Sequence, residues 1–497
     1  MVRHVALVAL TVVAACGDDS GQGQPADASV DVAVDAAPRQ IVAHAVVRQI
    51  VNDASRSPVA GPEVLYKMSS AAQRTGERMD VTLPIGAAGD IGFATLDDRY
   101  RLSVALDTTT PTEFQMRATQ LELSGRFVGR YDRTPPVAGT TLAATITNAP
   151  GTGTAVITST GVWTQTGRSG GTNGSFTIDW STQAASLGGP IGLLDAAQND
   201  RAYYIVLDVT GTAPQYAAIS SSCSADITMT AGAPTAFTCT AAPLAQSSCM
   251  HAQLHFAGET ARITAITGSL YPNYFNNWLL QATATPSTGI TSALLLAYQV
   301  PLASTTPSVD LDRNFTFGNP YPGTTPVLLM NTGKSRSFAL PGTNAMNISA
   351  TVNVYLPAAP DCATVTEGPT GFVAIPSLPR LDGVHLDSDA VTIGLASKLH
   401  TLTWDVASPG AADYWLVRVH RAIINGSNST RLSVVRSYVT LDHDVVLDPA
   451  DFTVGQTYFI EVQAVTGVPK AAMGDFREYT FPYATSSIFS SAFRITE

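Results

Sequence analysis

Short runs of alternating apolar and polar residues recur along the chain from about residue 40 onward. Successive side chains of a β-strand point to opposite faces, so each run predicts a half-buried strand. Turn-forming Gly, Pro, Asn and Asp separate many of these runs. Long helical patterns are hard to find. The expected fold class is therefore all-β, built from several β-sandwiches. Clear examples are Ile41–Val51, Met79–Leu83, Ala202–Val209, Cys249–Phe256, Met346–Tyr355 and Tyr458–Ala464.

The runs divide the chain, which has 497 residues, into three predicted folded units. Residues 40–117 form a small antiparallel unit, residues 118–366 a large central region, and residues 372–497 a C-terminal unit. A chain of this length can give each unit its own core. The central region could be one large sandwich, two sandwiches or a small propeller, and its lack of a clear internal repeat ranks the propeller last.

The chain begins differently, with a basic residue, Arg3, and the apolar run Val5–Val13, which is too short to span a bilayer. Val13-Ala14-Ala15-Cys16 then places small residues directly before a cysteine. This pattern resembles the lipobox of bacterial lipoproteins. The resemblance implies removal of residues 1–15 as a signal peptide and lipidation of Cys16, where several acyl chains would give stable anchoring to a membrane.

Residues 16–39 read as an acidic, Asp/Ala-rich disordered tether, because such a segment cannot bury enough apolar area to fold. Its composition is similar to tethers of myxobacterial lipoproteins. Gly17, rather than an aspartate, follows the cysteine. In enteric lipoproteins that choice favours the outer membrane, so we expect a cell-envelope protein there. The membrane face stays open.

Two of the folded units resemble known modules. In the first, Pro58–Val64 and Asp98–Leu102 resemble the prealbumin-like or carboxypeptidase-regulatory-like β-sandwiches of secreted bacterial proteins, although Asp97-Asp98-Arg99 replaces a usual glycine. In the last, Trp404, the strand around Leu447 and the corner-type Tyr458 resemble a fibronectin type III domain of the immunoglobulin-like class. These resemblances imply spacer and contact modules.

Composition agrees with a secreted β-rich protein, since hydrophobic residues make up 45% of the chain and charged residues 13%. The formal net charge is −11, and no cluster of Lys and Arg could neutralise a phosphate backbone. Nucleic acid is therefore not an expected partner.

Besides Cys16 the chain has four cysteines, an even number for a protein that leaves the reducing cytoplasm. Strand alternation places Cys223 and Cys239 on the apolar side of one predicted hairpin, which leaves Cys249 to pair with Cys362. No C-x-x-C spacing supports a metal site among them.

The sequence offers little catalytic or metal-binding chemistry, and we predict no cofactor. His251 and His255 lie four residues apart in a predicted strand, about 13 Å from one another and too far for one ion. Asp310 with Asp312, and Asp442 with Asp444, are pairs of carboxylates, fewer oxygens than calcium needs. The Gly-x-Ser-x-Gly run at 167–171 precedes a turn rather than the helix of a nucleophile elbow.

One run, 271–278, clusters aromatic residues with amides, a mixture that can stack on sugar rings or pack at an interface. Packing in the core or a loop is the competing interpretation. The candidate binding residues are Tyr271, Tyr274, Phe275 and Trp278.

Together these features predict an envelope-anchored lipoprotein with a binding, adhesion or structural role and no evident catalysis. Its expected partners are the membrane, through the lipid on Cys16, and an envelope protein or glycan. The alternative is an envelope hydrolase with its site in the central region, which would show a cleft lined by convergent acidic or histidine side chains.

Overall fold

The computed structural model describes residues 40–64, 66–68, 73–75, 78–84, 89–95, 101–106, 120–128, 133–150, 153–162, 164–165, 174–183, 191–210, 215–284, 294–299, 308–389, 391–394, 400–447, 449–469, 471 and 479–496. The protein is all-β in class, as the alternation predicts, with several packed sheets. The lipobox with Cys16, the tether and the run at 167–171 lie outside the described residues. Within these residues, no helix is long and apolar enough to cross a membrane.

The N-terminal unit consists of two sheets. One has the order β2-β1-β5-β4, with β8 also on β1, and the other has the order β3-β6-β7. The bounds are β1 Gln40–Asn52, β2 Pro58–Val64, β3 Tyr66–Met68, β4 Gln73–Thr75, β5 Arg78–Pro84, β6 Gly89–Thr95, β7 Arg101–Leu106 and β8 Gln120–Val128.

This unit differs from the expected antiparallel one in a single pairing. β8 runs parallel to β1 from Val42↔Gln120 to Gln49↔Phe127. By this pairing β8 belongs to the N-terminal sheet, although it lies beyond residue 117. Alternation shows that a strand exists, but it does not show which distant strand completes the sheet.

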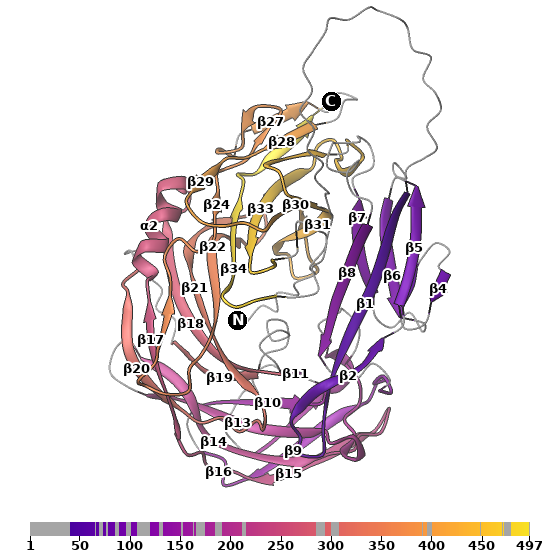
Figure 1. Ribbon diagram of the computed structural model, residues 1–497, viewed down its shortest axis with the longest axis vertical. Helices are drawn as coiled ribbons and strands as arrows, with labels where there is room; N and C mark the ends of the chain where they lie inside the picture. Colours follow the sequence, from indigo (N-terminus) through magenta and orange to yellow (C-terminus); the bar gives the residue numbers. More distant parts are fainter. Residues whose placement is uncertain are drawn as a thin grey trace, which may run out of the picture.

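A long curved sheet forms the rest of the molecule (Figure 1). Its main path runs β11-β10-β13-β14-β19-β18-β21-β22-β34-β33-β30-β31, with β16, β27 and β35 paired beside it. The bounds are β10 Thr154–Thr160, β11 Thr164–Gln165, β13 Arg201–Thr210, β14 Tyr216–Asp226, β16 Ala242–Pro243, β18 Asn273–Thr283, β19 Leu294–Gln299, β21 Thr325–Phe338, β22 Met346–Pro357, β27 Val391–Gly394, β30 Tyr414–Ile424, β31 Thr430–Thr440, β33 Thr457–Thr466, β34 Tyr483–Phe489 and β35 Phe493–Thr496.

The sheet continues across the boundary expected between residues 366 and 372. β22, from the central region, pairs antiparallel with β34, from the C-terminal unit, from Thr351↔Ser487 to Tyr355↔Tyr483. The two segments therefore share a hydrogen-bonded sheet, and their packed residues merge into one large apolar core.

Smaller sheets pack on the long one and bury its apolar faces. Their orders are β12-β9-β15, β20-β17-β23, β26-β25-β28-β32 and β24-β29. The bounds are β9 Thr141–Thr147, β12 Ser175–Asp179, β15 Pro234–Thr240, β17 Ser248–Leu254, β20 Leu311–Phe317, β23 Val365–Gly368, β24 Ile375–Pro376, β25 Arg380–Leu381, β26 Val384–His385, β28 His400–Thr403, β29 Val406–Ser408 and β32 Asp444–Leu447. Short 3-10 turns span Trp180–Thr182, Ala196–Gln198 and Pro449–Asp451.

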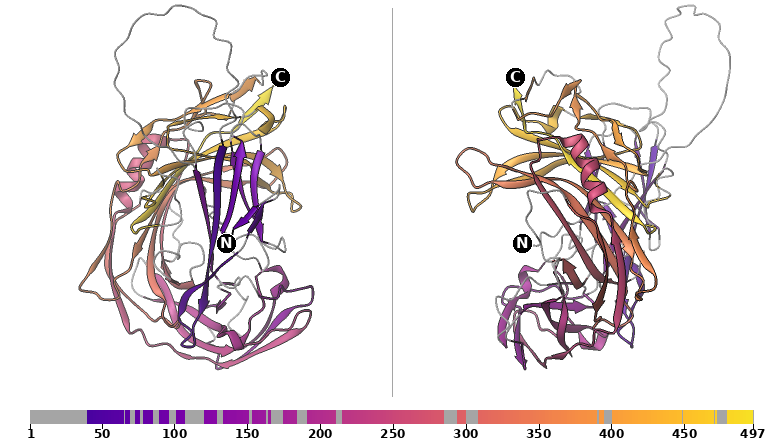
Figure 2. Two further views of the ribbon diagram at one scale, coloured as in Figure 1. Left: turned by 45° about the vertical axis from the view of Figure 1, so that its right-hand side comes forward. Right: turned by 90° about the vertical axis from the view of Figure 1, so that its left-hand side faces the viewer.

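The α-helix α2, Phe256–Thr267, lies over β21 and β22 on the outer side of the long sheet (Figures 1 and 2). The expectation that the strand continues through Phe256 is wrong. The strand ends at Leu254, and the Asp310 carboxylate accepts the Ala257 amide at the start of the helix, 2.7 Å away. Gly268, at φ 52°, ends it. The capping carboxylate comes from another strand, so local sequence does not reveal it.

The N-terminal unit contacts the long sheet through the β1–β2 turn. Arg56 pairs with the Asp226 carboxylate, with Nε 3.2 Å from Oδ1, and the Asn52 side chain donates to the Asn199 carbonyl at 3.1 Å. Ser57 packs against Gly323, where a Cβ would come within 2.4 Å of the Ser57 Cβ. The Gly- and Pro-rich loop 317–323 therefore seats this turn.

A buried ion pair fixes the chain just after this unit. Arg133 donates to the Asp200 carboxylate at 2.6 Å, and both side chains are buried. Burial raises the pKa of Asp200 to about 7, although the Arg133 charge opposes that shift.

In the C-terminal unit, β34-β33-β30-β31 face the sheet of β25, β28 and β32. Trp404 and Tyr458 are buried in the core that they share. The Tyr458 hydroxyl accepts the Thr453 amide at 2.7 Å, closing the corner before β33.

Replacing Tyr458 with Phe should lower the free energy of unfolding by about 1–2 kcal/mol, because the Thr453 amide loses its acceptor. The control is Tyr204→Phe, which removes a buried hydroxyl with no hydrogen-bond partner and should cost little. Denaturant unfolding measures both. Equal losses for the two variants would contradict the role given to the Tyr458 hydroxyl.

Candidate functional site

The aromatic run 271–278 does not form one binding platform. Tyr271 and Trp278 are buried, so neither can contact a ligand at the surface. The Tyr271 hydroxyl donates to the Phe489 carbonyl at 2.7 Å, and burial raises its pKa. Trp278 packs against Phe315, with ring centroids 4.5 Å apart. The core interpretation is the correct one for these two residues.

Tyr274 and Phe275 lie on opposite faces of β18, because neighbouring strand residues alternate. Tyr274 lies on the same face as Trp278, where the Lys334 ammonium sits 4.9 Å from its ring centre. Phe275 lies on the other face, half-buried, over Gly333, where an added Cβ would come within 2.8 Å of its ring. The sequence places these residues in one run, and the pleat of the strand separates them.

The face that carries Phe275 also carries a band of short polar side chains across neighbouring strands. Directly paired residues of an antiparallel sheet point to the same face. The first row of this band is Asn277, Asn331, Asn353 and Thr485 on β18, β21, β22 and β34. The second row is Phe275, Gly333, Thr351, Ser487 and Gln463, which ends on β33. We call these two rows the amide strip.

Hydrogen bonds between strands hold part of the amide strip in place. The Asn331 amide donates to the Asn353 carbonyl oxygen at 2.5 Å, and the Asn353 amide donates to the Thr485 hydroxyl at 3.4 Å. The hydroxyls of Thr351 and Ser487 lie 2.9 Å apart. Several side chains are thus oriented by their neighbours rather than by solvent.

Two acceptors in the amide strip remain unpaired. Asn277 Oδ1 and Gln463 Oε1 are both buried and accept no hydrogen bond. The Gln463 residue is only 7% exposed. A buried polar atom without a partner costs about 1–3 kcal/mol, so these oxygens favour a donor from outside the sheet.

The amide strip lies on the inner side of the arch. Its strands bury Trp278, Met330, Val352 and Val354 on the opposite face. Helix α2 and the strands β17 and β20 lie on the outer side of the arch (Figure 1). The strip therefore faces the side on which the N-terminal unit lies.

A charged cluster borders the amide strip at β30 and β33. The Glu461 carboxylate accepts from Arg418 at 3.0 Å and pairs with His420 at 2.9 Å, and both bonds reach the same oxygen, Oε2. Burial acts to raise the pKa of Glu461, but Arg418 and His420 outweigh it and hold that pKa at about 2. The cluster is internally compensated, so the neighbouring amides have no free charge of their own.

The predicted polar face of β17 gathers side chains that the sequence considered separately. His251 Nε2 lies 2.7 Å from Asp312 Oδ1 on β20. His255, which precedes α2, lies 3.5 Å from Asp310 and 3.6 Å from Glu367. These five side chains pair with each other on the outer face. Among the described residues, no group of three or more His, Cys, Asp and Glu side chains could hold a metal ion. Asp442 and Asp444 are exposed at the turn before β32.

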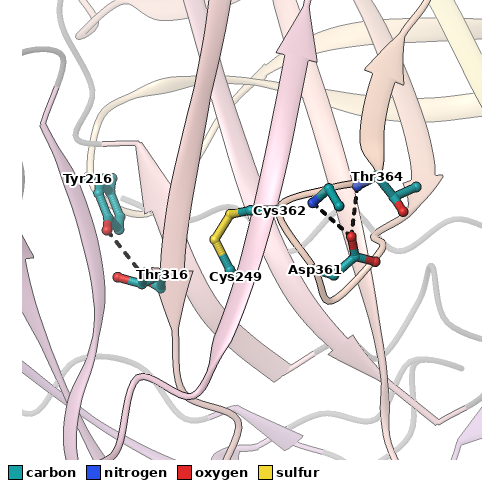
Figure 3. The surroundings of a disulfide bond; sticks show 7 residues. Tyr216, Cys249, Thr316, Asp361, Cys362 and Thr364 are labelled. Atoms are coloured by element: carbon teal, nitrogen blue, oxygen red, sulfur yellow. Dashed lines mark hydrogen bonds between the residues drawn. A yellow bond between two sulfur atoms is a disulfide. The ribbon is translucent and has the colours of Figure 1, made fainter.

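Both predicted disulfides are present. Cys223 and Cys239 have Cα atoms 5.9 Å apart, and Cys249 and Cys362 have theirs 5.2 Å apart. The second bond ties β17 to the loop before β23 (Figure 3). There Asp361 accepts the amides of Ala363 and Thr364 at 2.8 and 2.7 Å. The bond therefore closes a loop whose fold is set locally.

The chain matches no protein-family model and no curated protein.

Opening the two disulfides should have unequal effects. Cysteines 113 residues apart close a much longer loop than cysteines 16 residues apart. Replacing Cys249 and Cys362 with Ser should therefore cost about 4–5 kcal/mol of unfolding free energy, against about 3 kcal/mol for Cys223 and Cys239. Denaturant unfolding of the two double variants compares them, and the reverse order would contradict the assignment.

Glu461→Gln should lower the unfolding free energy by about 3 kcal/mol at pH 7, because it leaves Arg418 and His420 without their carboxylate. The pKa of Glu461 is lowered, so its stabilisation is complete above the unfolded-state pKa of about 4.5 and is lost as pH falls toward about 2. The difference between wild type and variant should shrink over that range in unfolding measured against pH. A difference that grows toward acid would be contrary to this account.

Proposed function

We propose that this chain is a lipid-anchored lipoprotein of the cell envelope whose β-rich body serves a binding, adhesion or structural role. The pattern Val13-Ala14-Ala15-Cys16 supports the anchor, and Arg3 with the apolar run after it supports export. The two disulfides support an oxidising compartment outside the cytoplasm. The outer membrane remains the proposed destination.

The observation that carries the binding role is the amide strip. It places amides and hydroxyls from five neighbouring strands on one face, and it leaves Asn277 Oδ1 and Gln463 Oε1 without donors. Binding sites commonly combine a preformed surface with a few oriented polar groups. An envelope glycan or protein is the partner class that we propose for it.

The two terminal modules fit this role as spacers or contact domains. The strand order of the C-terminal unit, its buried Trp404 and the Tyr458–Thr453 hydrogen bond support a fibronectin type III-like domain. The two sheets of the N-terminal unit support a prealbumin-like sandwich. Both modules would hold the long sheet away from the membrane.

The alternative is an envelope hydrolase. The gathering of His251 and His255 with Asp310, Asp312 and Glu367 favours it, because convergent acids and histidines in the central region are what such an enzyme needs. Cleavage of envelope glycans or peptides that disappears in a His251→Ala variant would establish this alternative.

The anchor is tested by replacing Cys16 with Ser and fractionating cells of a Gram-negative host. Wild-type protein should sediment with membranes and need detergent for release, and Cys16→Ser should move to the soluble fraction because it has no thiol to acylate. Ser20→Ala, a matched change in the tether, should stay with the membranes. A Cys16→Ser protein that remains membrane-bound would refute the proposal.

A further inference from the structure

We infer that the amide strip binds a neutral, hydroxyl-rich oligosaccharide that lies across strands β18, β21, β22, β34 and β33. The inference rests on the binding role proposed above and names its ligand class. It begins from the two buried acceptors, Asn277 Oδ1 and Gln463 Oε1, which lie near opposite ends of the strip.

The charge of the amide strip excludes ionic ligands in favour of neutral ones. An anion would add a further acceptor beside two unpaired acceptor oxygens. A cation would be buried without a counter-ion, because Glu461, the neighbouring carboxylate, already pairs with Arg418 and His420. Hydroxyl groups donate hydrogen bonds and carry no charge, so they meet the need at the lowest desolvation cost.

The spacing of the amide strip suits a chain rather than a single small molecule. Neighbouring strands lie about 4.8 Å apart, so the first row repeats a polar side chain at that interval over four strands. A hydroxyl both donates and accepts, as an amide side chain does. An oligosaccharide presents such groups repeatedly along its length and can satisfy successive positions of the row.

Phe275 adds a flat apolar surface to one end of the strip. Its ring lies over Gly333, and no side chain longer than hydrogen fits beneath it without displacement. The half-buried ring leaves part of its surface open. Aromatic faces pack against the apolar faces of sugar rings, so Phe275 would contact a sugar while the amides bind its hydroxyls.

The test uses the full chain with Cys16→Ser, so that a failed lipid anchor cannot affect the result. An array of neutral glucan, galactan and mannan oligosaccharides, with polygalacturonate fragments and unrelated peptides as comparisons, identifies what binds. Isothermal titration then measures affinity for the best neutral oligosaccharide. We expect binding to at least one neutral oligosaccharide and none to the anionic fragments.

Asn277→Ala is the informative variant, because it removes an acceptor that nothing in the described chain satisfies. It should weaken oligosaccharide binding about tenfold while leaving the unfolding free energy unchanged or higher. The matched control is Asn347→Ala, at the exposed start of β22, which should bind as wild type does. Phe275→Ala should also weaken binding.

Two results would overturn the inference. Binding only to peptides or to anionic fragments would assign another ligand class, while leaving the proposed binding role in place. Binding of a neutral oligosaccharide that is equally strong in wild type, Asn277→Ala and Phe275→Ala would move the site away from the amide strip.

Discussion

The pairing of β22 with β34 is the constraint on which most of this structure depends. It joins strands from two parts of the chain that the sequence separates into different domains, and it makes one sheet of them. The seam also lies inside the amide strip, where Asn353 meets Thr485 and Thr351 meets Ser487. If these strands did not pair, the two rows of polar side chains would be divided between separate bodies.

Packing on the two faces of this sheet has different chemical character. On the outer face, Trp278, Met330 and Val354 belong to an apolar core that continues into the C-terminal unit. On the inner face, the corresponding alternate positions carry amides and hydroxyls. Burial of apolar area supplies the stability of the sheet, so the inner face is free to carry groups that contribute little to folding. The unpaired oxygens of Asn277 and Gln463 reduce stability, which is typical of residues retained for binding.

Local patterns in the sequence predicted much of the fold and little of the candidate site. Alternation located strands such as β22 and β33, and it paired Cys223 with Cys239 because both residues face the same side of one hairpin. Contacts between distant segments were not predictable in this way. The parallel pairing of β8 with β1 and the capping of α2 by Asp310 both depend on residues far apart in the chain. The aromatic run drew attention to β18, but its alternation buries Trp278 and leaves Asn277 on the binding face.

Native-state hydrogen exchange of β22 and β34 tests the central claim most directly. If one sheet joins the two segments, peptides covering residues 346–357 and 483–489 should have similar protection and lose it together as denaturant increases. Exchange of 483–489 at a distinctly lower denaturant concentration, with 346–357 still protected, would show that the segments fold as separate bodies. The continuous sheet, and with it the amide strip, would then be ruled out.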